Sequence, residues 1–330
     1  MIHTTLCDLL GIDHPVLNAP MGGTAAAELA AAVSGAGGFG MIGGTSRGGA
    51  DWLREQIRGV RARTDRPFGV GFISSFPGTD DLVQVALDER VAAINHSFAD
   101  ASPYVAAAHA RGVRVFAMVQ TVAQGVGAAR AGVDVVVAQG TEGGGHTGGI
   151  GTLALVPAVV DAVGEVPVVA AGGIADGRGL AAALLLGAVG AWVGTRFVAS
   201  HEWGGGTWEQ RAVVAASADD TIRTTAFDRV RRAPFPEGIA DRVLRNAFTD
   251  AWEGRDADIE ARREELAVAI KAAAQAGDAS MVDVSAGVAA GLVTAVEPAA
   301  AIVRRLVRDA EHVLRAGAGA LDSSPVPNRS

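Results

Sequence analysis

One short stretch carries the residues whose types and order could transfer protons or electrons. Residues 133–138 form a valine-rich run, which is typical of a strand buried on both faces. The run leads into Gln139 and then, after Glu142, into three consecutive glycines and His146. Because glycine has no Cβ, a flat ligand can approach this backbone closely, and a histidine beside it could move a proton. His146 is therefore our candidate catalytic residue, and the alternative is a surface loop with a solvated histidine.

Two later glycine-containing segments are candidates for phosphate binding. Gly172 and Gly173 follow the predicted strand at 167–171, and Gly194 precedes Thr195 in a further predicted strand. Backbone N–H groups in such turns and at helix starts attract anions, and the Thr195 hydroxyl adds a donor. The plainer interpretation is that these glycines only permit tight turns. Two candidates on neighbouring strands favour an anion site.

A flat, phosphorylated cofactor accounts for both features. The glycine loop before His146, the phosphate candidates and the pair Gly22-Gly23 after the first predicted strand would all meet one ligand, and FMN has the right size and shape. Pyridoxal phosphate requires a Schiff-base lysine. The chain has a single lysine, Lys271, within a predicted amphipathic helix. These observations predict FMN as the cofactor.

The elements that must position these residues alternate between strands and helices. Crossovers of this kind make the strands parallel, and eight such units in about 200 residues are close to the size of a closed barrel. An open doubly wound sheet is the alternative, but it would place one glycine fingerprint after the first strand. Glycines after several strands instead favour a ring of loops, so we predict a (β/α)8 TIM barrel over residues 1–199. The predicted strands are 15–21, 39–42, 68–73, 91–96, 113–119, 133–139, 167–171 and 191–197.

The pattern changes after residue 199. Residues 200–290 mix polar and aromatic clusters with an amphipathic stretch at 258–276, and we predict a mostly helical cap over the substrate. Residues 291–316 are predicted to hold a helix that returns to the barrel. The Ser- and Pro-containing residues 317–330 are predicted to be a disordered tail.

Composition excludes several functional classes. The net charge of −8 argues against a nucleic-acid surface, and no segment has the apolar length of a membrane span. The N-terminus has no basic region followed by an apolar one, so we expect no secretory signal and a cytoplasmic location. A single cysteine, Cys7, excludes an internal disulfide, and no grouping of histidines and carboxylates predicts a metal site.

At these residues the chain resembles the FMN-dependent nitronate monooxygenases, also called 2-nitropropane dioxygenases, and the related FMN-dependent enoyl-ACP reductases. The resemblance covers nearly the whole chain and includes the motifs NAPM, AQGTEGGGHTGG, PVVAAGGIADGRGL, GAWVGTRF and VSAGVAAGL. It implies that His146 is the catalytic histidine and that Ser285 lines the substrate pocket. It also implies FMN contacts at Ala19, Met21, Gly22, Gln139, Gly144, Gly145, Gly172, Gly173, Gly194 and Thr195.

The chain departs from the family pattern at two positions that lie near the flavin in the family. Gly71 stands where some members have an asparagine, and Gln120 stands where some have a lysine. We retain Gln120 as a cofactor-binding candidate and expect these departures to affect flavin reactivity. His96 ends the fourth predicted strand, so it is a further candidate for substrate contact.

The resemblance implies a monooxygenase that oxidises alkyl nitronates with O₂. The alternatives are an NAD(P)H-dependent enoyl-ACP reductase or quinone reductase on the same fold, and a non-enzymatic flavin or small-ligand binding module. The expected partners are a small-molecule substrate and O₂, with a homodimer as one option for assembly.

Overall fold

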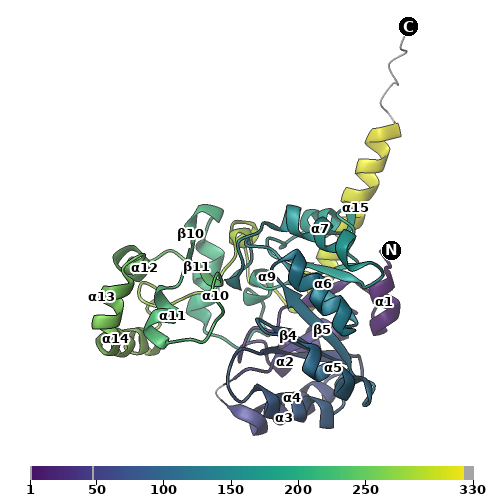
Figure 1. Cartoon of the computed structure of the whole chain (residues 1–330). Helices are drawn as coiled ribbons and strands as arrows, with labels where there is room; N and C mark the ends of the chain where they lie inside the picture. Colours follow the sequence, from purple (N-terminus) through teal and green to yellow (C-terminus); the bar gives the residue numbers. More distant parts are fainter. Residues whose placement is uncertain (1, 47, 323–330) are drawn as a thin grey trace.

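The computed structural model of the chain describes residues 2–46 and 48–322. Eight parallel strands are ordered β1-β9-β8-β6-β5-β4-β3-β2, and a bridge between Leu17 and Phe39 joins the two end strands into a barrel. This confirms the predicted TIM barrel. Figure 1 labels β4 and β5 of this barrel and shows helices packed around it. The strands are β1 (Val16–Asn18), β2 (Gly40–Gly43), β3 (Phe68–Ile73), β4 (Ala93–Ser97), β5 (Arg114–Val119), β6 (Val135–Gln139), β8 (Val168–Ala171) and β9 (Gly190–Val193).

Helices follow the strands and cover the outside of the barrel. Their starts follow from local chemistry in two clear cases. Thr121 and Gln124 form a capping box at the start of α6, and the Asp176 carboxylate accepts the backbone N–H groups of Arg178 and Gly179 at the start of α8. The helices are α1 (Thr5–Leu10), α2 (Ala27–Gly35), α3 (Gly49–Arg61), α4 (Thr79–Asp88), α5 (Ser102–His109), α6 (Val122–Ala131), α7 (Thr152–Val163), α8 (Gly177–Leu185), α9 (Thr195–Val198) and α10 (Thr207–Ala215).

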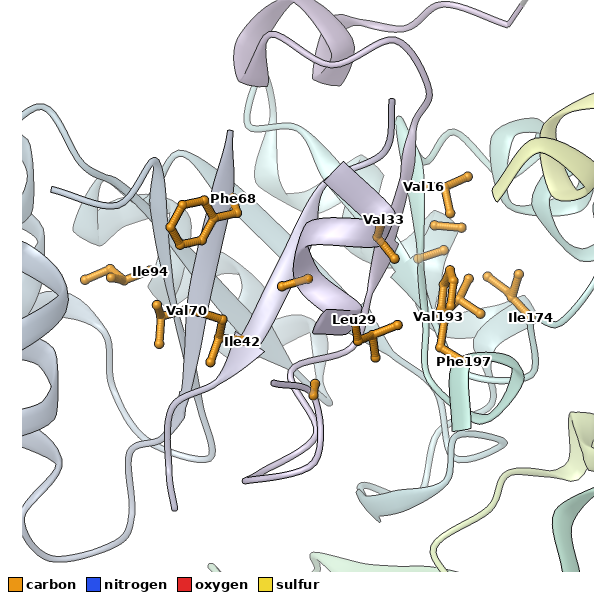
Figure 2. Packing of buried hydrophobic residues seen from close by; sticks show 14 of the residues in the cluster. Val16, Leu29, Val33, Ile42, Phe68, Val70, Ile94, Ile174, Val193 and Phe197 are labelled. Atoms are coloured by element: carbon orange, nitrogen blue, oxygen red, sulfur yellow. The ribbon is translucent and has the colours of Figure 1, made fainter. Parts of the chain in front are cut away.

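The barrel strands bury both faces in two apolar clusters. The inner cluster fills the barrel and includes Leu17, Phe116 and Trp192. The outer cluster lies between strands and helices, and Figure 2 shows Leu29 and Val33 of α2 among its residues. Because side chains alternate across a strand, burial of both faces requires the nearly continuous apolar runs seen in the sequence.

A second unit, the cap, is built mainly from residues 218–292 and contains more strand than the sequence predicted. Its antiparallel sheet has the order β10-β11-β7, from β7 (Gly145–Thr147), β10 (Thr221–Thr224) and β11 (Ala240–Leu244). The strand β7 comes from the barrel loop after β6, so His146 follows the glycine loop as predicted but lies in a short strand, which the sequence analysis did not predict. The other cap elements are α11 (Ala226–Arg231), α12 (Ala247–Trp252), α13 (Asp256–Ala261), α14 (Arg263–Ala276), and the 3-10 helices η1 (Ala218–Asp220) and η2 (Val288–Leu292).

The chain returns to the barrel through α15 (Ala299–Asp322), which begins later and ends later than the predicted helix. It packs closely on α8, because a Cβ on Gly177 would lie 2.4 Å from the backbone nitrogen of Ala310. The predicted tail is wrong for residues 317–322, which are helical, and residues 323–330 lie outside the described residues. Within the described chain, no helix combines the length and apolar character needed to cross a membrane.

Candidate active site

A cavity of about 350 Å³ lies between the C-terminal ends of the barrel strands and the cap. This is the face at which active sites of TIM barrels are found. Most of the predicted site residues line it together. They are Ala19, Met21, Gly22, Gln139, Gly144, Gly145, His146, Gly172, Gly173, Gly194, Thr195 and Ser285.

Packing requires glycine at two positions of the turn after β8. Gly172 and Gly173 have φ of 100° and 74°, which side chains rarely adopt. A Cβ on Gly172 would lie 2.7 Å from the carbonyl oxygen of Gly140, and one on Gly173 would lie 3.2 Å from Cβ of Glu142. The loops after β6 and β8 therefore lie in close contact, which supports the packing interpretation of these glycines. Both glycines also line the cavity, and phosphate binding by them stays a prediction.

Gly194 and Thr195 lie where β9 ends and α9 begins, and not inside a longer strand as predicted. The Thr195 hydroxyl oxygen accepts the backbone N–H of Gly287 at 2.9 Å, which ties the barrel to the cap segment. Among the described residues, a Cβ on Gly194 would have one neighbour within 4 Å, the Cβ of Ala19 at 3.4 Å. This position therefore has room for a ligand or a small side chain.

His146 is held on three sides. Its Nε2 lies 3.0 Å from each carboxylate oxygen of Asp228, 82 residues later in the chain. Phe235 stacks on the imidazole with ring centroids 3.4 Å apart, and Phe98 meets it edge-on at 6.2 Å. With 17% of its side chain exposed, His146 faces the cavity from a fixed position.

A cluster of charged cap residues surrounds the histidine. Asp241 of β11 lies opposite His146 of β7 in the antiparallel sheet, and Asp241 is 3% exposed. Burial raises the pKa of Asp241 to about 6, although the nearby His146 opposes that rise. The Ser285 hydroxyl donates to Asp241 at 3.3 Å, and Asp283 pairs with Arg231. A titratable carboxyl thus lies directly behind a serine of the cavity wall.

Two predicted site residues do not reach the cavity. Gln120 is absent from the cavity wall and its side-chain amide donates to the side-chain oxygen of Gln139, which lines the cavity, at 3.0 Å. His96 is fully buried on the outer side of β4, stacked on Tyr104 at 4.1 Å and bonded to Ser74 at 2.8 Å. Strand alternation explains the His96 result, because the next residue, Ser97, is the one that lines the cavity.

Gly71, one of the two departures from the family pattern, packs closely against Pro20. A Cβ at this position would lie 2.3 Å from Cγ of Pro20. The proline ring therefore occupies the space that a side chain on β3 would need. Both Gly71 and Pro20 line the cavity, so their contact forms part of its wall.

Sequence reasoning missed two partners of His146, which are Asp228 and Phe235. It also missed several residues of the cavity wall, among them Phe98, Trp203 and Glu209. Trp203 directly precedes the GGGTW segment, and burial raises the pKa of Glu209. Asp228 lies in the segment FDRVRR, which has no distinguishing pattern. Among the described residues, no cluster of three histidine, cysteine, aspartate or glutamate side chains could hold a metal ion.

Comparison with known proteins agrees with this geometry. The sequence profile of the family described as nitronate monooxygenase matches residues 3–82 and 74–309. A nitronate monooxygenase of Metarhizium robertsii is 36% identical over 91% of this chain and 91% of its own length. A carboxyl-CoA dehydrogenase of Mycobacterium tuberculosis, acting on a methyl-oxo-octahydroindene compound, is 36% identical over 76% of this chain and 69% of its own length.

Solved structures show the same architecture. FabK from Thermotoga maritima superposes with a TM-score of 0.88 and 35% identity, covering 97% of this chain and 100% of FabK. The match therefore includes the cap as well as the barrel. The chain is an enzyme that belongs to the nitronate monooxygenase family.

Proposed function

We propose that the protein is an FMN-dependent nitronate monooxygenase that oxidises alkyl nitronates with O₂. The observation that carries this proposal is the meeting of His146 with the glycine turns at 172–173 and 194 in one cavity of about 350 Å³. That volume lies within the range of ligand pockets. Family membership supports the reaction class, and FMN, when bound, would supply the redox chemistry.

The residues present fit FMN. Within the described chain, a Cβ on Gly145 would meet nothing within 4 Å, and its φ of 77° disfavours a side chain, so a planar ring could lie against this backbone. No lysine or arginine is among the described residues that line the cavity. Backbone N–H groups near Gly173 and Gly194, with the Thr195 hydroxyl, would therefore bind the phosphate.

His146 would act as the general base for substrates that still carry an acidic proton. In this role the histidine removes the proton on the carbon that bears the nitro group, and the cap loop with Phe235 excludes water. A substrate added as the preformed nitronate has already lost this proton. The role of His146 can therefore be separated from its general importance by comparing the two substrate forms.

His146→Ala tests this role. The variant should retain FMN, and its kcat/KM on a neutral nitroalkane should fall by about 10²–10⁴-fold, the usual contribution of a positioned general base. Its loss on the corresponding nitronate should be much smaller. Steady-state O₂ consumption with both substrates measures the contrast. Equal losses would mean that His146 positions substrate or stabilises charge and that the base lies elsewhere.

A second candidate function is the reduction of an acyl thioester with electrons from NADH or NADPH, or its oxidation with transfer of the electrons to an oxidised acceptor such as NAD⁺. It is favoured by the 36% identity to a carboxyl-CoA dehydrogenase, which equals the identity to the nitronate monooxygenase of Metarhizium robertsii. This alternative includes the enoyl-ACP reductase hypothesis. Reduction of the bound flavin by NADH or NADPH, faster than by nitronate, would favour it.

A further inference from the structure

We propose that Asp228 is a positioning residue that keeps the His146 proton on Nε2, so that Nδ1 is the nitrogen that accepts the substrate proton. The inference rests on the proposed function, because it assigns an atom to the base in that reaction. It names a residue from a different unit of the protein, 82 positions beyond His146.

The hydrogen bond determines the tautomer. An ionised carboxylate can only accept hydrogen bonds, so the imidazole nitrogen that it contacts must carry the proton. Both oxygens of Asp228 lie 3.0 Å from Nε2 of His146. In the neutral ring the lone pair is then on Nδ1. A carboxylate that orients an imidazole in this way also stabilises the imidazolium that forms when the ring accepts a proton.

The position of Asp228 in the cap favours its hydrogen bond with His146. It lies in the first turn of α11, where the neighbouring Phe227 and Val230 are buried in the cap core. Its side chain is 12% exposed, and among the described residues His146 is the hydrogen-bond partner of its carboxylate. The helix is therefore anchored on one side and presents the carboxylate on the other.

The arginines beside Asp228 do not compete for it. Arg229 pairs with Asp256, and Arg231 pairs with Asp283. Arg232, which follows the helix, pairs with Glu260. Each nearby cation thus has its own carboxylate, which leaves the Asp228 charge to face the imidazole.

The aromatic contacts complete the positioning. The stacked Phe235 and the edge-on Phe98 restrict rotation of the His146 ring about its Cβ–Cγ bond. In the reaction, the C–H bond next to the nitro group breaks, its electron pair moves onto the nitro group, and the proton moves to Nδ1. The product pair is a nitronate and an imidazolium that faces the Asp228 carboxylate.

The experiment compares Asp228→Asn with Asp256→Asn, which removes a carboxylate that pairs with the adjacent Arg229 and does not contact His146. An asparagine can either accept from or donate to Nε2, so it no longer enforces one tautomer. For Asp228→Asn we expect kcat/KM on a neutral nitroalkane to fall by at least about 10- to 100-fold, the loss typical when a partner that orients a metal-ligating histidine is removed. The loss on the preformed nitronate should be much smaller, and Asp256→Asn should match the wild type on both.

Two further measurements make the result decisive. Long-range ¹⁵N–¹H spectra of histidine-labelled protein, with His146 assigned from the His146→Ala spectrum, should show the Nε2–H tautomer in the wild type and a mixture in Asp228→Asn. The double variant Asp228→Asn/His146→Ala should be no slower on the nitroalkane than His146→Ala alone. FMN content measured for each variant controls for loss of fold.

The outcomes separate this inference from the function on which it rests. Wild-type activity and an unchanged tautomer in Asp228→Asn would overturn the inference, as would additive losses in the double variant. A tautomer change in Asp228→Asn, together with equal losses on both substrates in His146→Ala, would support positioning by Asp228 but contradict the base role of His146.

Discussion

The barrel and the cap meet at one cavity but contribute to it in different ways. The barrel side is formed largely by backbone at the ends of strands, as at Gly172, Gly173 and Gly194. The cap side brings charged and aromatic groups, including Asp228 and Phe235, to bear on His146. Backbone groups are suited to binding a cofactor that stays in place from one turnover to the next. Side chains are suited to recognising a substrate and to transferring a proton.

The two units also differ in how they are held together. The barrel has inner and outer apolar clusters that run around the whole ring. The part of the cap formed by α11–α14 has a separate, smaller cluster around Phe227, Phe248 and Trp252, whereas other cap residues, such as Leu244 and Val284, belong to the outer barrel cluster. From this difference we expect that the cap can lose structure while the barrel remains folded, in keeping with the uneven local stability of proteins.

Replacing Phe248 with alanine should break the cap and spare the barrel. Phe248 is fully buried and stacks on Phe227 with ring centroids 4.4 Å apart. Removing such a ring costs about 3–5 kcal/mol. Hydrogen exchange should therefore accelerate across α11–α14, while barrel amides keep their protection.

Phe116→Ala is the matched control, because Phe116 is fully buried inside the barrel and contacts Phe39 and Trp192. This variant should lower protection throughout the chain. If Phe248→Ala also lowered protection of the barrel strands, the two units would form a single cooperative structure and the contrast between them would fail.

Gly194→Asp should remove the cofactor without breaking the cap. Its Cβ is tolerated beside Ala19, but its carboxylate would face the proposed phosphate. Two like charges about 4 Å apart repel by about 4 kcal/mol at an effective dielectric of about 20, roughly a thousandfold in affinity. Gly173 is a poorer choice for this test, because its φ of 74° would strain any side chain.

FMN titration by fluorescence quenching measures the effect, with Gly194→Asn as the control of equal size and no charge. We expect the aspartate variant to purify without flavin and the asparagine variant to retain most of its affinity. Equal FMN affinity in the two variants would place the phosphate away from Gly194.

Asp241 should give the cap a pH dependence. Its pKa is raised by burial to about 6, above its ordinary value of 3.8. The folded protein therefore holds this proton more tightly than the unfolded chain, so the contribution to stability is fully present below pH 3.8 and is lost as pH rises through about 6. The loss across this window should be up to about 3 kcal/mol.

Comparison of the wild type with Asp241→Asn isolates this contribution, because other titrating groups cancel in the difference. Urea unfolding at a series of pH values should show that the wild type loses stability relative to the variant as pH rises. Parallel stability curves for the two proteins would show that Asp241 titrates alike in the folded and unfolded states.

Most of the barrel could be predicted because each of its strands is marked by a local apolar pattern in the sequence. Runs such as Phe68–Ile73 and Val135–Gln139 are buried on both faces, and their apolar pattern marks each strand directly. The glycines that follow them mark the turns. The error at His96 shows the limit, because a shift of one residue along a strand moves a side chain from the cavity to the outer face.

The cap could not be predicted to the same depth. Its strands β10 and β11 are short, and β11 pairs with β7 from a distant part of the chain. The contact between Asp228 and His146 spans 82 residues and depends on that pairing. No local periodicity or spacing in the sequence predicts such a contact, so Asp228 could be identified as the partner of His146 only from the fold.

Anaerobic mixing of the flavin-loaded enzyme with substrate tests the central claim most directly. A nitronate, for example that of 2-nitropropane, should bleach the visible absorbance of the flavin, and added O₂ should restore it. NADH and NADPH should act more slowly than the nitronate. Rapid bleaching by NADH with none by nitronate would contradict the proposed nitronate monooxygenase and favour the acyl-thioester reaction.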